Sequence, residues 1–360
     1  MESYINANKD LWKKYDKIIL WGASDGGQRC YNWLKALGRA DKIDCFIDRN
    51  SVLHGKKLFD KQINPPDYIH SNGYAVIAST LFWPSVKEYL DSNNILNPFF
   101  VYFNMETPYK TGPLTAHNVD DLLSLYADDA FTAEMINFNR YAKGNGCHFV
   151  LPVDLNLPFF SEAVPYKGYG YWAAKKTNLD IYKNITLIDC GAYIGDSLAV
   201  LRDSTASKIV KAYCIEPDPI NIEKMKDFLK SRGLLDIAVI IEGGAGERCG
   251  KYRLIGADMG VNLSEVEGGD INVITIDSLN LDVAGKLCIK MDIETFEMKA
   301  LRGAENTIKR YKPELAVCVY HQDSDIYEIP RYIKSIEPAY NCILRDGAHM
   351  TCYASVDRYI

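Results

Sequence analysis

Residues 185–216 have the residue types and the spacing of a nucleoside-binding turn. Two short apolar runs flank a glycine-containing segment: Asp189 follows the first run, Gly191 and Gly195 lie in the segment, and Glu216 ends the second run. The pattern predicts a buried strand, a sharp turn, a helix that begins near Gly195, and a second strand ending in Glu216. An acid at that strand end can accept hydrogen bonds from both hydroxyls of a ribose. We therefore expect a nucleoside to bind here.

The middle of the turn indicates which nucleoside is bound. A dinucleotide fingerprint has glycine where this chain has Tyr193, because a pyrophosphate presses against the backbone there. A side chain at this position is compatible with S-adenosyl-L-methionine, which has no phosphate. Asp189 also suits the charged amino group of that donor better than it suits a phosphate. The alternative is an ordinary strand-to-helix turn with an aspartate that caps the helix.

Side chains suited to catalysis follow two later predicted strands. Asp292 and Glu294 come directly after one apolar run, and His321 follows the next. The carboxyl ends of parallel strands meet where ligands bind, so these groups are expected to converge on the acceptor. A histidine suits a general base, although a structural histidine is a comparable interpretation. Asp292 with Glu294 either binds acceptor hydroxyls or a divalent ion, or caps a helix and pairs with Lys290; we assign no metal ligand.

The composition excludes several classes of protein. The chain has 360 residues, of which 48% are hydrophobic, and a net charge of −6. No basic run stands out, so binding to nucleic acid is not expected. No segment approaches about 18 consecutive apolar residues and the N-terminal residues are polar, so we expect no membrane span and a cytoplasmic location. Most of the ten cysteines lie in strand-like runs, as reduced thiols do, and no C-x-x-C motif indicates zinc.

The N-terminal part repeats the order of strand, glycine turn, helix, strand and acid. An apolar run at 17–22 leads into a glycine-rich segment and a helix, and a second run at 43–47 ends at Asp48. Further strands expected at 74–78 and 99–102 complete a small parallel sheet. The candidate ligand-contacting residues of this part are Gly22, Gly26, Gly27 and Asp48. They predict either a bound nucleotide or nucleotide-sugar, or a structural or docking role.

The alternation of strands and helices predicts an α/β fold in three parts. These are a smaller Rossmann-like domain at residues 1–108, a helical and irregular connector at 109–165, and a larger domain at 166–360. Apolar residues at helical spacing predict one helix over 120–139 in the connector and another over 296–310 in the larger domain. The chain is expected to close with an antiparallel strand pair at 341–344 and 350–355.

Four segments of the larger domain resemble successive blocks of the FkbM family of S-adenosylmethionine-dependent methyltransferases. They are TLIDCGAYIGDS at 186–197, CIEPDP at 214–219, VITIDSL at 273–279 and IKMDIETFEMKALRGA at 289–304. The resemblance implies a class I methyltransferase fold, with a seven-stranded Rossmann-like sheet, and S-adenosyl-L-methionine as cofactor. The residues expected to contact the cofactor are Asp189, Gly191, Ala192, Tyr193, Gly195, Asp196, Ser197, Glu216, Pro217, Gly244, Ala245 and Asp292.

The same resemblance bears on the acceptor. Members of the family methylate a hydroxyl, often on a sugar or a polyketide-derived acceptor, and usually have glycine after the Asp-x-Glu motif. Here Thr295 and Phe296 follow the motif, and their bulk is expected to narrow the acceptor pocket. The first 60 or so residues more loosely resemble the Rossmann-like domains that precede sugar-modifying enzymes such as bacterial sugar acetyltransferases, which suggests a nucleotide-sugar substrate.

These observations predict an O-methyltransferase that acts on a sugar, nucleotide-sugar or glycan precursor, with His321, Asp292 and Glu294 as catalytic residues. Two alternatives belong to other classes. One is a nucleotide-dependent sugar oxidoreductase or epimerase that uses the N-terminal part. The other is a non-catalytic protein that binds a glycan precursor.

Overall fold

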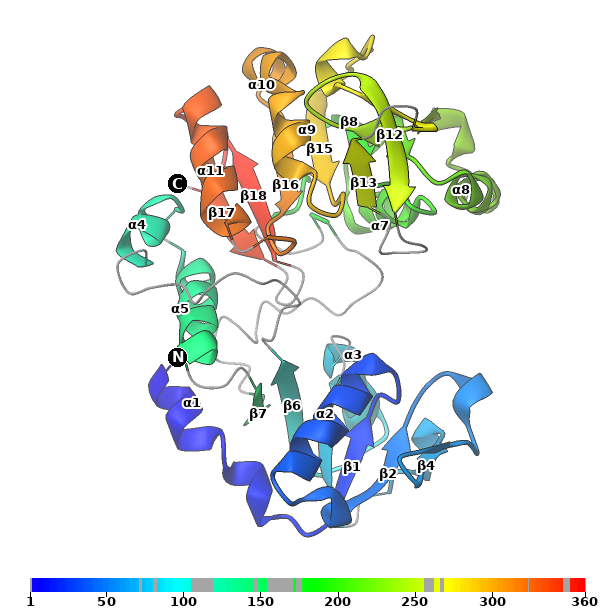
Figure 1. Cartoon of the computed structure of the whole chain (residues 1–360), viewed down its shortest axis with the longest axis vertical. Coiled ribbons are helices and arrows are strands. Elements are labelled where there is room, and N and C mark those ends of the chain that lie inside the picture. The colour runs from blue at the N-terminus through cyan, green and yellow to red at the C-terminus, as the bar shows by residue number, and fades with distance from the viewer. Residues whose placement is uncertain are drawn as a thin grey trace. The chain divides into compact units, whose positions relative to one another are not determined.

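The computed structural model describes residues 2–70, 73–79, 83–104, 119–127, 129–144, 148–153, 171–172, 177–255, 262–265, 269–322, 324–345 and 350–359. Contacts divide the chain into two compact units. Unit 1 comprises Met1–Ala116 and Glu134–Tyr166, and unit 2 comprises His117–Ala133 and Lys167–Ile360. Each unit contains a seven-stranded, mostly parallel sheet, which confirms the predicted α/β class (Figure 1). The boundaries predicted at residues 108 and 165 stay predictions.

The sheet of unit 1 is built from short apolar runs. In spatial order its strands are β3 (Lys57–Leu58), β4 (Lys61–Asn64), β2 (Ile43–Ile47), β1 (Ile18–Trp21), β5 (Ala75–Ala78), β6 (Phe99–Asn104) and β7 (His148–Pro152). All neighbours are parallel except the pairs at the two edges, β3 with β4 and β6 with β7. Every residue of β1 and β5 is buried, as expected for strands covered on both faces.

The helices of unit 1 pack against this sheet. They are α1 (Glu2–Asn8), α2 (Asp25–Ala36) and α3 (Trp83–Ser92), together with the 3₁₀ turns η1 (Leu11–Lys14), η2 (Ala40–Lys42), η3 (Ser51–Leu53) and η4 (Pro66–Tyr68). Cys30, Tyr31 and Leu34 of α2 lie at helical spacing and join one hydrophobic cluster with the strands. The helix thereby covers one face of the unit 1 sheet.

The sheet of unit 2 carries the candidate site. In spatial order its strands are β10 (Ala238–Glu242), β9 (Lys208–Glu216), β8 (Asn184–Cys190), β15 (Lys286–Met291), β16 (Glu314–Cys318), β18 (Thr351–Ser355) and β17 (Asn341–Arg345). Only β18 runs antiparallel to its neighbours, which confirms the predicted closing pair. The strand order reverses between β8 and β15, so their carboxyl ends open a crevice.

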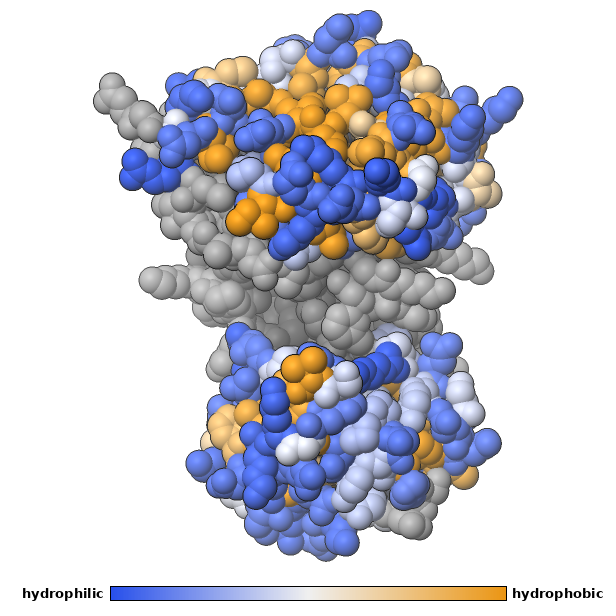
Figure 2. Space-filling model, turned by 90° about the vertical axis from the view of Figure 1, so that its right-hand side faces the viewer, coloured by the Kyte–Doolittle hydropathy of each residue, from blue (hydrophilic) through white to orange (hydrophobic). Residues whose placement is uncertain are grey.

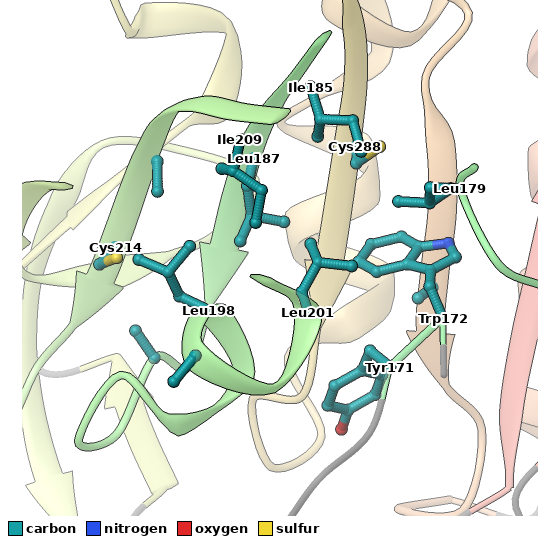
Figure 3. Close-up of a cluster of buried hydrophobic side chains, with 14 of the residues drawn as sticks. Tyr171, Trp172, Leu179, Ile185, Leu187, Leu198, Leu201, Ile209, Cys214 and Cys288 are labelled. Atoms are coloured by element: carbon teal, nitrogen blue, oxygen red, sulfur yellow. The ribbon is translucent and has the colours of Figure 1, made fainter. Parts of the chain in front are cut away.

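Helices on the unit 2 sheet bury a continuous core. They are α4 (Val119–Ser124), α7 (Asp196–Ser204), α8 (Pro219–Ser231), α9 (Glu297–Arg302), α10 (Glu305–Tyr311) and α11 (Asp325–Ile336), with the 3₁₀ turns η6 (Leu235–Ile237) and η8 (Ile276–Ser278). Figure 3 shows Leu198 and Leu201 of α7 pointing toward Leu187 of β8, within one buried cluster. Each such leucine contributes about 1.5–3 kcal/mol by burial, which holds the helix against the strand beside the crevice.

A second, four-stranded sheet lies in unit 2. Its order is β11 (Gly244–Ala245), β14 (Ile271–Ile274), β12 (Gly250–Ile255) and β13 (Asn262–Glu265). Tyr252 of β12 and Val273 of β14 form a small core with Phe296, whose ring meets that of Tyr252 edge-on at 5.9 Å. The position of Phe296 in this core differs from the prediction that it narrows the acceptor pocket.

Two predicted helices are each divided in the structure. The helix predicted over 120–139 is α4 followed by α5 (Ala130–Gly144), which spans the division between the units. The start of α5 is set by Asp129, which accepts hydrogen bonds from Thr132 and pairs with Arg345 of β17. The helix predicted over 296–310 is α9 followed by α10, because Asp277 accepts hydrogen bonds from the backbone of Asn306 and Thr307 and begins a new helix there.

The surfaces of the two units differ in one view. Figure 2 shows apolar residues gathered on the visible face of unit 2, whereas the visible face of unit 1 is largely hydrophilic. Helix α8 lies on this side in Figure 1, and its Ile220 is 64% exposed. Among the described residues, none of the helices has the length and apolarity that a membrane crossing requires.

Candidate active site

A pocket opens at the carboxyl ends of β8, β9 and β15 in unit 2. It is lined by Gly191, Tyr193, Asp196, Ser197, Ile215, Glu216, Pro217, Asn221, Gly243, Gly244, Ala245, Lys290, Asp292, Ile293, Glu294 and Tyr320. Parallel strands deliver side chains to this edge, and the free N–H groups of α7 begin there. The pocket therefore lies where the sequence predicts the nucleoside.

Glu216 is held in a fixed position at the end of β9. Its Oε2 atom accepts the Tyr193 N–H at 2.9 Å, and its Oε1 atom accepts the Asp218 N–H at 3.1 Å and the Asn221 side-chain amide at 3.3 Å. Burial raises the pKa of Glu216, and these hydrogen bonds oppose that shift. Each carboxylate oxygen can accept two hydrogen bonds, so Oε2 can still accept one from a ribose hydroxyl.

The turn after β8 depends on backbone that a side chain would obstruct. Gly191 has φ of +77°, and a Cβ atom there would lie 2.0 Å from the carbonyl oxygen of Asp292. Gly195 has φ of +81°, and a Cβ atom added there would lie 2.9 Å from the Leu229 side chain. Gly191 thus brings the turn against the end of β15, and Gly195 brings the start of α7 against α8.

Asp189 and Lys290 form a buried ion pair beneath the pocket. The Nζ atom of Lys290 lies 3.0 Å from Oδ1 of Asp189 and donates to the Gly191 carbonyl at 2.6 Å. Burial lowers the pKa of Lys290, but the carboxylates of Asp189 and Asp292 outweigh that effect and leave the pKa raised. Burial also raises the pKa of Asp189, although Lys290 opposes the shift. Asp189 therefore neutralises Lys290, where the sequence predicts contact with the donor's amino group.

Asp292 follows β15 and accepts hydrogen bonds from two tyrosine hydroxyl groups. Tyr171 donates to its Oδ2 atom at 2.7 Å, and Tyr320 donates to its Oδ1 atom at 2.9 Å. Burial acts to raise the pKa of Asp292, but Lys290, His321 and the two phenols prevail and leave the pKa below its ordinary value. Asp292 is therefore an ionised carboxylate with a fixed orientation at the wall of the pocket.

His321 lies behind Asp292 and Glu294, and its side chain is 1% exposed. Its Nδ1 atom lies 2.8 Å from Oε1 of Glu297, which also accepts the Ile293 N–H. Its Nε2 atom lies 3.5 Å from Oδ1 of Asp292 and 3.6 Å from Oε2 of Glu294. Burial lowers the pKa of His321, but the Glu297 carboxylate and the other two acids raise it to about 10. The surrounding acids therefore favour the protonated form of the ring.

The structure brings most of the predicted residues to one pocket. Those that line it are Gly191, Tyr193, Asp196, Ser197, Glu216, Pro217, Gly244, Ala245, Asp292 and Glu294. Four predicted residues lie outside the lining. Asp189 pairs with Lys290, Ala192 and Gly195 form the turn, and His321 contacts the pocket through Asp292 and Glu294.

The sequence predicts Lys290 only as a partner of Asp292 and gives no indication of several other residues of the site. Lys290 interrupts an apolar strand two positions before Asp292, and that alternation is a signal that both side chains share one face. Tyr320 and Asn221 also line the pocket. Glu297 sits in the first turn of α9, where an acid ordinarily complements the helix dipole, so nothing local indicates its contact with His321.

The departure from the family motif has a backbone consequence. Glu294 has φ of +51° and Thr295 has φ of +80°, both in the left-handed region that favours glycine. A β-branched threonine is strained in this conformation. The glycine expected after the Asp-x-Glu motif would occupy a position where it is conformationally suited.

The chain is similar to known methyltransferases. The family model described as Methyltransferase FkbM domain matches residues 189–339. The solved structure of a methyltransferase FkbM from Methylobacillus flagellatus KT covers 94% of this chain and 90% of its own, with a TM-score of 0.52 and 21% identity. A methyltransferase from Geobacter sulfurreducens covers 68% of this chain and 97% of its own, at 14% identity and a TM-score of 0.33. A search of the curated proteins finds no match. Residues 189–339 match the FkbM methyltransferase domain, and on this match the chain is a methyltransferase enzyme.

Proposed function

We propose that the enzyme transfers a methyl group from S-adenosyl-L-methionine to a hydroxyl of a sugar, nucleotide-sugar or glycan precursor. The charge of the pocket carries the assignment of the donor. Four carboxylates line it, those of Asp196, Glu216, Asp292 and Glu294, against the single ammonium of Lys290. Lys290 is already paired with Asp189. The excess negative charge attracts a cationic sulfonium and repels the pyrophosphate of a dinucleotide.

The residues present fit that donor. The Glu216 carboxylate is fixed at the strand end where a ribose is bound in such folds, and Gly243 and Gly244 leave space for a flat base beside it. S-adenosyl-L-methionine supplies an activated methyl group, so the protein needs to align donor and acceptor and to remove one proton. Asp196 and Ser197, at the first turn of α7, lie on the side of the pocket expected to hold the methionine part.

The acceptor is expected beside Asp292, Glu294 and Tyr320. These side chains offer carboxylate and phenol oxygens, which suit a polyhydroxylated acceptor, and Glu294 is the most exposed of the carboxylates around His321. Removal of the hydroxyl proton falls to the carboxylates of Asp292 and Glu294, which line the pocket, and His321 acts through its contacts with both. The sugar class rests on the sequence resemblance and on the polar character of this wall.

Two measurements test the proposal. Calorimetric titration with S-adenosylhomocysteine should show one binding site, titration with NAD should show none, and Glu216→Ala should weaken the former. Incubation with a methyl-labelled donor and fractionated nucleotide-sugars or glycan precursors should then yield a product heavier by one methyl group in mass spectrometry. Binding of NAD in place of S-adenosylhomocysteine would refute the donor, and label found only in protein, lipid or nucleic acid fractions would refute the acceptor class.

A further inference from the structure

Three side chains of the site converge in a way that the methyl donor does not explain. Asp292, Glu297 and His321 each offer one ligand atom, and these atoms all lie within 4.8 Å of one another. Glu294 adds a further carboxylate oxygen 3.6 Å from Nε2 of His321. Three acids around one imidazole form a polar cluster of the kind that binds divalent cations.

The imidazole is aimed into this cluster. His321 is 1% exposed, and its Nε2 atom makes no hydrogen bond among the described residues. The distances of 3.5 Å to Asp292 and 3.6 Å to Glu294 are too long for hydrogen bonds. Two ligands held about 2.1 Å from one ion lie about 3–3.5 Å apart, so these separations suit a shared ion.

Glu297 fixes the orientation of the ring. Its Oε1 atom lies 2.8 Å from Nδ1 of His321 and also accepts the Ile293 N–H, so that Nδ1 is the hydrogen-bonded nitrogen. Nε2 is then the nitrogen that faces Asp292 and Glu294. A carboxylate bonded to the distal nitrogen of a metal-binding histidine is the usual supporting contact of such a site.

The positive groups that act on these acids are Lys290 and the His321 ring. Lys290 lies 3.0 Å from Asp189 and donates to the Gly191 carbonyl, so its charge is shared between Asp189 and Asp292. A divalent ion at Nε2 would displace the proton of the ring and supply the larger positive charge that three acids can balance.

We propose that His321 Nε2, together with the carboxylates of Asp292 and Glu294, binds a divalent first-row transition-metal ion, with Glu297 holding the ring. One imidazole and two carboxylates favour Mn²⁺ or Fe²⁺ over Mg²⁺, which prefers oxygen ligands alone. The catalytic part of this inference rests on the proposed function. An ion here would polarise an acceptor hydroxyl and assist its deprotonation.

Titration with Mn²⁺ tests the site without donor or acceptor. The loss of the free Mn²⁺ signal in electron paramagnetic resonance should report one ion per chain in the purified full-length protein. Glu294→Gln and His321→Gln should each weaken Mn²⁺ binding at least about tenfold. The Glu294 side chain is 33% exposed, so its replacement should disturb the fold little. Glu297→Gln should weaken Mn²⁺ binding about 10–100-fold through the ring alone. Mg²⁺ should bind more weakly than Mn²⁺.

Glu216→Gln is the matched control, because it removes a carboxylate of the same pocket away from His321 and should leave Mn²⁺ affinity unchanged. Circular dichroism verifies that each variant is folded. The inference fails if no saturable site appears up to about 1 mM Mn²⁺, or if Glu294→Gln and His321→Gln bind as the parent does. A parallel titration with S-adenosylhomocysteine separates this outcome from failure of the proposed donor.

Discussion

Both units contain the same arrangement of strand, turn and acid, but buried charged side chains accompany it only in unit 2 among the described residues. In unit 1 the Ala23 N–H, in the turn after β1, donates to Asp48 after β2 at 2.8 Å. In unit 2 the Tyr193 N–H, in the turn after β8, donates to Glu216 at the end of β9 at 2.9 Å. The acid therefore ties the glycine turn to the neighbouring parallel strand in both units.

The buried polar groups distinguish the two units. Within the described residues, those of unit 1 are Asn64 and Ser79, both uncharged. The buried ionisable side chains of unit 2 are Asp129, Asp189, Glu216, Lys290, Glu297, Glu314, His321, Asp325 and Arg345. Since burial of charge is costly, its concentration in unit 2 indicates chemistry there. The order of strand, turn and acid links two neighbouring parallel strands in both units. The side chains around the turn determine which ligand binds there.

The glycines of unit 1 serve packing. A Cβ atom on Gly26 would lie 2.2 Å from the carbonyl oxygen of Ser79, and one on Gly27 would lie 2.0 Å from that of Gly22. They allow α2 to approach the strand ends closely. The Asp48 carboxylate accepts backbone N–H groups of Ala23 and Asn50. The nucleotide predicted at Gly22, Gly26, Gly27 and Asp48 stays a prediction.

The largest expected effect comes from adding a methyl group to one closely packed glycine in each unit, Gly191 of the turn after β8 and Gly27 of α2. In Gly191→Ala and in Gly27→Ala the new Cβ atom would lie 2.0 Å from a backbone carbonyl oxygen, so each should lower the free energy of unfolding by about 4 kcal/mol. Urea unfolding measures this loss. Gly191→Ala should also abolish binding of S-adenosylhomocysteine, whereas Gly27→Ala should leave its affinity intact. Loss of binding in both variants would show that the two units do not act separately.

The buried acids of unit 2 should make its stability depend on pH. Burial, followed by repulsion from Glu297, raises the pKa of Asp325 to about 7 from an ordinary 3.8. The folded state therefore favours the protonated carboxyl, and this contribution is fully present below about pH 4 and lost as the pH rises through 7. Asp325→Asn should stabilise the protein, by an amount that grows about 2–3 kcal/mol between pH 5 and pH 8. Thermal unfolding across that range checks the result, and a gain independent of pH would contradict it.

Replacing the acid of each unit by alanine shows which of the two acids contributes to binding of S-adenosylhomocysteine. Glu216→Ala should weaken S-adenosylhomocysteine binding by about 1–2 kcal/mol, since hydrogen bonds to a charged group are lost. Asp48→Ala removes the corresponding hydrogen bond of unit 1 and should leave that affinity unchanged. Calorimetric titration of both variants provides the comparison. Equal affinities in the two variants would remove the distinction between the units.

The smallest effect concerns backbone strain. Thr295 has φ of +80°, so Thr295→Gly should raise the free energy of unfolding by about 0.5–1 kcal/mol. Asp60 of unit 1 has φ of +65°, but aspartate tolerates this conformation, and Asp60→Gly should change stability by less. Chemical denaturation of both variants measures the difference. A Thr295→Gly variant less stable than the parent would mean that the threonine side chain makes contacts worth more than the strain.

The sequence predicted the elements that are defined by short apolar runs. The run at 43–47 is β2, and β1 and β5 each lie within one residue of the runs at 17–22 and 74–78, because strands buried on both faces tolerate few polar residues. Helix α11 was missed, since Pro330 stands inside it and suggests a break. Strand β12 was missed because Lys251 and Arg253 interrupt its apolar pattern.

The site was predictable where strand ends decide position. Asp292, Glu294 and Glu216 follow strands, and the carboxyl edge of the sheet brings them to one pocket. Contacts between distant segments were not predictable. The partners of Asp189 and His321 are Lys290 and Glu297, and the choice depends on how strands and helices pack, which no local spacing records.

Lys290 makes three positions mutually dependent. Its ammonium neutralises Asp189, attracts Asp292 and holds the Gly191 carbonyl, so any one charge changed alone leaves another buried without its counterpart. Substitutions here should be strongly epistatic, with Asp189→Asn and Lys290→Met each harmful singly and less harmful together. Homologous sequences should accordingly exchange these residues in pairs. Directed evolution of the pocket would have to change Asp189 and Lys290 together or leave both unchanged.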